Sequence, residues 1–171
     1  KASKRAEGGL DRVGRTRLVQ VAGGSRSGGA LVVGRREAKN PGGSVKDRIA
    51  LAMILKAEAD GLIRPGHSVL VEATSGNTGI AVAMVGAARG YKVVVAMPRL
   101  QSMLERYLLV RAFGGEVLLS EPELKSQGFL DLAADYARDH YAALCYAMLC
   151  YAMPCYAMPC YATLCCAMLR C

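Results

Sequence analysis

A lysine and a glycine-rich turn form the first part of this sequence that could carry chemistry. Lys46 stands in the string NPGGSVKDR at 40–48, where glycines let the backbone approach a ligand and the lysine follows at a helix start. A lysine that forms a Schiff base has to lose its proton, and desolvation beside the positive end of a helix favours that loss. Lys46 is therefore a candidate for covalent chemistry with a carbonyl group, and a solvated surface lysine is the alternative.

A second loop, TSGNTG at 74–79, joins a buried strand to a helix. Free N–H groups at the helix start would converge there with hydroxyl and amide side chains, which favours binding of an anion. The alternative is that Thr74 or Asn77 is only the helix N-cap and that the glycines are turn residues. By contrast, GGSRSGG at 23–29 lacks the strand before it and the helix after it that a dinucleotide-binding loop needs, so we expect a surface loop.

The segments around these loops alternate between strand and helix patterns. Expected strands cover 30–34, 68–73, 92–97 and 116–120, and expected helices cover 45–60, 79–89, 102–114 and 127–139. Ile49, Met53 and Ala57 would form the apolar face of the first helix, and Ser102 with Glu105 has the form of a capping box. Strands separated by single helices predict a parallel sheet covered on both faces, with the two loops at its carboxyl ends, where ligands bind.

The net charge of +8 is concentrated near the start of the chain, where residues 1–39 carry ten Lys or Arg against three Asp or Glu. This segment lacks interleaved aromatic residues and any nucleic-acid-binding motif, so we expect no nucleic acid as a partner. The hydrophobic fraction of 53% suffices for a buried core, and we expect no membrane span. The arginine-rich start opens on Lys1, not Met; we expect a cytoplasmic protein, with plastid or mitochondrion as alternatives.

All seven cysteines lie in residues 145–171, within a five-residue YAxxC unit that repeats from residue 141. A period of five fits neither helix nor strand, and Pro154 and Pro159 interrupt both. The C-x4-C spacing without histidine is not a usual zinc pair, so we expect no metal, with a zinc site or a disulfide framework as alternatives. We therefore expect a basic extension at 1–9, a folded part at 10–140 and a low-complexity tail at 141–171 that is not a folded domain.

Five strings in this order resemble the cysteine synthase family. They are VGRTRLV at 13–19, NPGGSVKDR at 40–48, DGLIRPGHSVLVEATSGNTG at 60–79, ARGYKVVVAMP at 88–98 and SMLER at 102–106. The resemblance runs from about residue 10 to about residue 140, and cystathionine β-synthases share both loops. It implies the α/β fold of fold type II pyridoxal-phosphate enzymes, similar to tryptophan synthase β, of which this chain would be the N-terminal part. It also implies a homodimer for the intact protein.

By this resemblance, Lys46 would hold pyridoxal 5′-phosphate as a Schiff base and Asn77 would hydrogen-bond the 3′ oxygen of its ring. Thr74, Ser75 and Thr78 would bind the substrate carboxylate. The implied reaction is β-replacement on O-acetylserine, in which sulfide enters and acetate leaves to give L-cysteine, with the cofactor as electron sink. A cystathionine β-synthase-like activity and an inactive truncated homologue that pairs with an intact subunit are the alternatives.

The chain also departs from the family's pattern. Arg17 stands where the family usually has proline, and Tyr107 follows Glu105 and Arg106 where a second basic residue is common. The family's glycine-rich loop for the cofactor phosphate, and the hydroxyl residue that faces the pyridine nitrogen, would lie beyond residue 140. The resemblance therefore covers only part of the family's cofactor site.

Overall fold

The structure is a computed structural model, and it describes residues 9–21, 31–140 and 143–144. The expected loop at 23–29 lies outside the described residues. So does the repeat segment, apart from Ala143 and Leu144. The boundary that we place at residue 140 stays a prediction.

A parallel sheet forms the centre of the described chain, with the strand order β5-β4-β3-β6. The strands are β3 (Val69–Ala73), β4 (Lys92–Pro98), β5 (Glu116–Ser120) and β6 (Ala143–Leu144). In the register, Val71 lies opposite Val94 and Ala96 lies opposite Leu118. The helices are α1 (Lys46–Ala59), α2 (Asn77–Arg89), α3 (Leu104–Ala112) and α4 (Lys125–Asp139). The expected alternation of strands and helices is confirmed from the helix expected at 45–60 onward.

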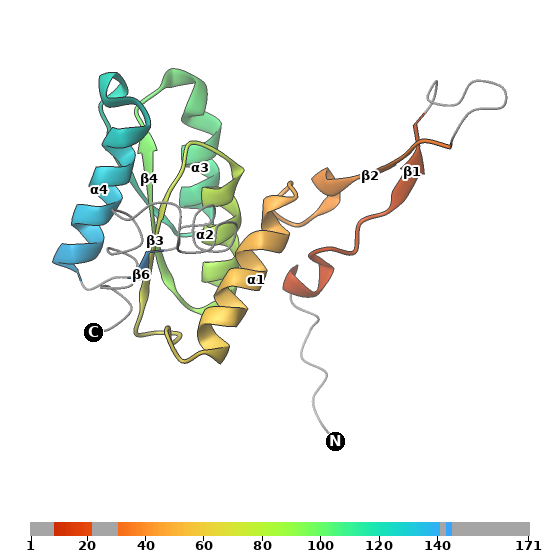
Figure 1. Cartoon of the computed structure of the whole chain (residues 1–171), viewed down its shortest axis with the longest axis horizontal. Coiled ribbons are helices and arrows are strands. Elements are labelled where there is room, and N and C mark those ends of the chain that lie inside the picture. The colour runs from red at the N-terminus through yellow and green to blue at the C-terminus, as the bar shows by residue number, and fades with distance from the viewer. Residues whose placement is uncertain (1–8, 22–30, 141–142, 145–171) are drawn as a thin grey trace, which may run out of the picture.

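Helices cover both faces of this sheet, as the strand pattern predicts (Figure 1). Because neighbouring residues of a strand point to opposite faces, Val93 and Val95 join the core beneath α2 and α3. Val94 points the other way and packs with Ala133 and Ala137 of α4. Helix α1 lies against α2, outside the layer that touches the sheet. Its buried apolar residues are Ala50 and Ile54, whereas the face expected from the sequence is only half-buried.

The first expected strand differs from the prediction of a buried strand at 30–34. The structure has an exposed strand, β2 (Val33–Arg35), paired antiparallel with β1 (Leu18–Gln20) in a separate two-stranded sheet. This pair extends away from the body of the molecule as an arm (Figure 1). The apolar run at 30–34 is therefore not a strand of the parallel sheet, since no helix layer of the described chain covers it.

The capping box expected at Ser102 and Glu105 is wrong. Ser102 belongs to a short 3-10 helix, η3 (Gln101–Met103), and α3 follows it without a side-chain cap. The Tyr107 hydroxyl instead holds the chain before the helix, donating to the carbonyl of Pro98 and accepting from the N–H of Leu100 at 2.9 Å. A tertiary contact of a buried tyrosine thus replaces the local cap.

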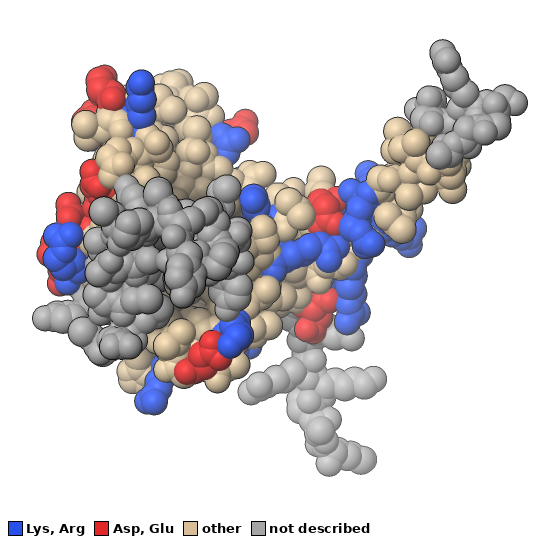
Figure 2. Space-filling model, viewed as in Figure 1, with Lys and Arg blue, Asp and Glu red and all other residues tan. Residues whose placement is uncertain are grey.

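Exposed basic side chains gather where the arm meets the body (Figure 2). They are Arg15, Arg17, Arg35, Arg36 and Lys39. Within the described ranges, every helix is too short or too polar to cross a membrane.

Candidate functional site

Both candidate loops lie at one end of the molecule. Glu58, near the end of α1, pairs with Arg89 at the end of α2 and accepts a hydrogen bond from the Tyr91 hydroxyl at 2.9 Å. Because the two helices have their C-terminal ends together and pack side by side, their starts at Lys46 and Asn77 share the opposite end. Figure 1 shows that this is the end at which β3 and β4 finish.

The prediction that both loops follow strands of the sheet is half right. The loop at 74–79 follows β3, but the turn at 40–45 follows a short 3-10 helix, η2 (Glu37–Lys39), beyond the arm. This turn reaches the carboxyl end of the sheet only because α1 packs along α2. The packing of the two helices therefore positions this turn, and the order of strands in the sequence does not predict it.

Lys46 is the first residue of α1 and is half-buried. Its backbone N–H donates to Ser44 Oγ at 3.1 Å, so the main chain at this point is held in place. Among the described residues, no side chain or carbonyl accepts a hydrogen bond from its ε-amino group. Within this part of the chain, the amine is therefore available to bind a ligand.

The turn before Lys46 is closed by a buried carboxylate. Asp47 is fully buried, and its Oδ2 accepts a hydrogen bond from the N–H of Gly42 at 2.6 Å. A Cβ at Gly42 would lie 2.6 Å from Asp47 Oδ1, so only glycine fits there. Burial raises the pKa of the Asp47 carboxyl, against the opposing effect of the Gly42 hydrogen bond. Gly43 has a φ of +85°, which favours glycine for a second reason.

The second loop presents an uncapped helix start. The N-cap of α2 is Gly76 in an extended conformation, and no side chain of residues 9–21 or 31–140 caps the first turn. Thr74 Oγ1 accepts a hydrogen bond from the N–H of Gly76 at 3.1 Å, inside the loop, so neither Thr74 nor Asn77 serves as the N-cap. Asn77 and Ser75 are exposed and Thr78 is buried. The first amides of α2 remain open to an anion, which the helix dipole would favour.

The sequence interpretation missed a polar network that surrounds the first loop. Glu37, one turn before Asn40, forms an ion pair with Arg48 at 2.9 Å and accepts a hydrogen bond from Thr16 Oγ1 at 2.9 Å. The hydrogen bond from Arg48 is the largest of the effects that lower the pKa of Glu37 to about 2. Arg48 and Asn40 belong to the string at 40–48, but Glu37 lies in a charged stretch that is typical of a solvated loop.

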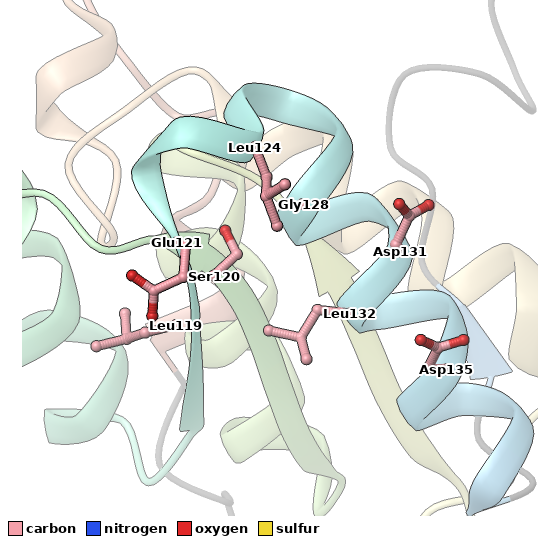
Figure 3. A pocket seen from close by; sticks show the side chains of 8 residues that line it. All are labelled: Leu119, Ser120, Glu121, Leu124, Gly128, Asp131, Leu132 and Asp135. Atoms are coloured by element: carbon pink, nitrogen blue, oxygen red, sulfur yellow. The ribbon is translucent and has the colours of Figure 1, made fainter.

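A shallow hollow of about 240 Å³ lies elsewhere, between the end of β5 and helix α4 (Figure 3). Its lining includes three carboxylates, Glu121, Asp131 and Asp135, as well as Leu124 and Leu132. These acids would repel an anionic ligand, and none of the five predicted site residues lines the hollow. We therefore do not assign it to the site at the starts of α1 and α2.

In the part of the chain that the structure describes, a parallel sheet with helices on both faces has a lysine amine without a hydrogen-bond partner and a helix start without a side-chain cap at the carboxyl ends of its strands. These features define a class of α/β ligand-binding protein. The profile of the family described as "Pyridoxal-phosphate dependent enzyme" matches residues 10–154. The chain belongs to this family.

Its curated relatives include the O-ureido-L-serine synthase of Streptomyces lavendulae, 47% identical over 132 residues, which are 77% of this chain and 40% of that protein. Cysteine synthase B of Escherichia coli is 46% identical over 73% of this chain and 41% of its own length. The crystal structure of cysteine synthase from Entamoeba histolytica matches with a TM-score of 0.75 at 32% identity, over 86% of this chain and 44% of that one. The chain thus spans about two fifths of the length of the relatives it matches.

Proposed function

We propose that this chain carries the half of a cysteine synthase-like active site that holds pyridoxal 5′-phosphate through Lys46. The observation that carries the proposal is that a lysine amine and a helix start, both without a side-chain partner among the described residues, share one location at the starts of α1 and α2. These groups fit the cofactor, because the amine is available for a covalent link and Asn77 is exposed for a hydrogen bond to the ring 3′ oxygen. The family membership supports the same cofactor.

The substrate in this proposal is O-acetylserine, with sulfide as the second substrate. Its carboxylate would bind at the loop of Thr74, Ser75 and Thr78, where open amides favour a negative charge. The Lys46 amine would take the proton from the substrate Cα and later return it, while acetate leaves Cβ and a sulfur–carbon bond forms there. When bound, the cofactor supplies a sink for the electron pair at Cα. The products are L-cysteine and acetate, and a homodimer is the assembly proposed for the intact protein.

A second candidate differs only in the nucleophile. The relative of Streptomyces lavendulae is named for the synthesis of O-ureido-L-serine, and it is as similar to this chain as the cysteine synthases are. A solved lysine-to-alanine variant of an O-ureido-L-serine synthase with O-ureido-L-serine bound matches this chain with a TM-score of 0.72. The same site would then join a nitrogen-bearing hydroxyl compound, not sulfide, to the substrate Cβ.

The test uses the full chain with added pyridoxal phosphate, beside the variant Lys46→Ala. After borohydride reduction, peptide mass spectrometry should find the cofactor on Lys46 in preference to the exposed Lys39. Absorption spectra with and without O-acetylserine then report whether substrate reaches the bound cofactor. Spectra identical to free cofactor for both proteins, with no preference for Lys46, would contradict the proposal.

A further inference from the structure

One carboxylate, Glu37, lies between the N-terminal arm and helix α1 and accepts four hydrogen bonds. Its Oε1 accepts from Arg48 Nη2 at 3.0 Å and from Thr16 Oγ1 at 2.9 Å. Its Oε2 accepts from Arg48 Nε at 2.9 Å and from Asn40 Nδ2 at 2.7 Å. Arg48 therefore grips the carboxylate with two parallel hydrogen bonds, a geometry that fixes direction as well as distance. The Glu37 side chain is only 21% exposed, so solvent screens this pairing incompletely.

These contacts hold the chain on both sides of Lys46. Arg48 follows Lys46 by two residues in the first turn of α1, and Asn40 precedes it in the turn. Asn40 Nδ2 also donates to the carbonyl of Ser44 at 3.0 Å, and Ser44 Oγ accepts from the N–H of Lys46 at 3.1 Å. A continuous path of hydrogen bonds thus connects Glu37 with the backbone of Lys46.

The same network ties the turn to the segment before the arm. Arg48 Nη2 donates to the carbonyl of Gly14 at 2.9 Å, and the N–H of Gly14 donates to Asn40 Oδ1 at 2.8 Å. The residue at the N-cap of α1, Val45, offers no side-chain hydrogen bond to the helix. Besides the local hydrogen bond from Lys46 to Ser44, the start of α1 is therefore held by residues that are distant in the sequence, and its N-cap residue contributes no side-chain bond.

We propose that Glu37 is a positioning residue for Lys46. It fixes the start of α1 and thereby the position of the ε-amino group that binds a ligand. The inference rests on the proposed function for its chemical meaning. Glu37 acts through Asn40 and Arg48, without contact to substrate or cofactor. A displacement of a reacting group by about 1 Å can lower a rate roughly a hundredfold, so a network that fixes the start of α1 matters for the reaction.

The test compares three full-length chains: the unchanged protein, Glu37→Gln and Glu58→Gln. Glutamine keeps the shape of glutamate, but its amide nitrogen cannot accept, so at least one of the four donors loses its acceptor. Glu58→Gln is the matched control, because Glu58 pairs with Arg89 and with the Tyr91 hydroxyl at the opposite end of α1. Amide hydrogen exchange at Gly42, Gly43 and Lys46 is measured first, without cofactor.

Exchange at these three amides should quicken by roughly tenfold or more in Glu37→Gln and stay unchanged in Glu58→Gln. The rate at which pyridoxal phosphate becomes fixed to Lys46 by borohydride should fall by roughly ten- to a hundredfold in Glu37→Gln alone. Unchanged exchange in Glu37→Gln, or equal effects of both variants, would overturn the positioning role. The expected exchange pattern without labelling of Lys46 in the unchanged protein would support the positioning role and overturn the proposed function.

A milder pair of variants covers the case in which Glu37→Gln fails to fold. Thr16→Val removes one of the four donors to Glu37 and leaves the carboxylate in place, whereas Thr16→Ser keeps the hydroxyl. Faster exchange at Gly42 and Lys46 in Thr16→Val, restored in Thr16→Ser, supports the network. Equal exchange in both Thr16 variants and the unchanged protein contradicts it.

Discussion

At the scale of the residue, Asp47 stabilises the turn before Lys46 by a hydrogen bond, but burial of its carboxylate is unfavourable for the charged form. Its carboxylate closes the turn through the N–H of Gly42, but Asp47 Oδ1 has no hydrogen-bond partner among the described residues. Burial is the largest effect on this group and raises its pKa above the ordinary value of 3.8. The folded protein therefore holds this proton to a higher pH than the unfolded chain does.

This difference predicts a pH-dependent effect of Asp47→Asn. As the pH rises above 3.8, the unfolded chain loses its proton first, so the contribution of Asp47 to stability falls. Asparagine keeps an acceptor for Gly42 and removes the buried charge. The difference in Tm between Asp47→Asn and the unchanged protein should therefore grow in favour of the variant as the pH rises above 3.8, as measured by circular dichroism.

Asp139→Asn, at an exposed position near the end of α4, serves as the control for this measurement. A Tm difference for Asp47→Asn that is constant over the same pH range would show that burial does not govern this carboxyl.

At the scale of elements, two neighbouring residues of helix α1 that are alike in size differ in burial. Ile54 is 1% exposed and belongs to the core with Leu70, whereas Leu55 is 42% exposed. Ile54→Ala should lower the free energy of unfolding by about 2–5 kcal/mol, because it removes a buried side chain and leaves a cavity. Leu55→Ala should change it by no more than about 0.5 kcal/mol.

Urea titration followed by circular dichroism measures both variants. Equal losses for the two substitutions would mean that α1 buries a different face from the one in the structure.

The arm of β1 and β2 is the element with the least support from the rest of the described chain. Leu31 is 66% exposed and Leu18 is 58% exposed, and an isolated pair of strands is marginally stable in water. Such apolar surface promotes association between molecules. The double variant Leu18→Glu with Leu31→Glu should weaken self-association by roughly tenfold or more in sedimentation velocity, with the Tm of the body nearly unchanged.

Leu124→Glu is the control for the arm, because Leu124 is equally exposed but lies on the body near α4. Sedimentation that is unaffected by the double variant, or equally affected by the control, would exclude the arm as the associating surface.

At the scale of the whole molecule, two glutamate–arginine pairs fasten the ends of α1. Glu37 joins its start to Thr16 in the segment before the arm, and Glu58 joins its end to α2. The hydrogen bond from the partner arginine is the largest effect that lowers the pKa of each carboxyl, to about 2 for Glu37. Because the unfolded chain protonates near the ordinary value of 4.5, these contributions are complete above that pH and are lost as the pH falls below it, down to about 2 for Glu37.

The Tm of the protein should therefore decrease as the pH falls from 4.5 toward 2, and Glu58→Gln should lower the Tm at neutral pH while flattening this decrease. Glu123→Gln, at an exposed position, should leave the curve unchanged. Differential scanning calorimetry across this pH range gives the comparison. A decrease of the same steepness in Glu58→Gln would exclude the pair with Arg89 as a source of the acid sensitivity.

The sequence by itself determined the elements whose signals are local. The valine-rich runs of β3 and β4 and the small-residue helix between them are read directly from consecutive residues, as is the left-handed glycine at Gly90 that ends α2. The same holds for Lys46 at a helix start, because a glycine turn followed by periodic apolar residues marks that position. The alternation of these elements also determined the parallel sheet with helices on both faces, since a strand–helix–strand unit has one favoured handedness.

Only the tertiary structure decided what lies around Lys46. Thr16 and Gly14 reach Arg48 and Asn40 from far along the chain, and the spacing of residues carries no signal for such contacts. Local patterns were wrong about the cap of α3, because a tertiary contact of Tyr107 holds that helix start. They were also wrong about burial of the strand at 30–34, because no helix of the described chain covers it. Burial and hydrogen bonding depend on what packs from elsewhere, and that information exists only once the chain has folded.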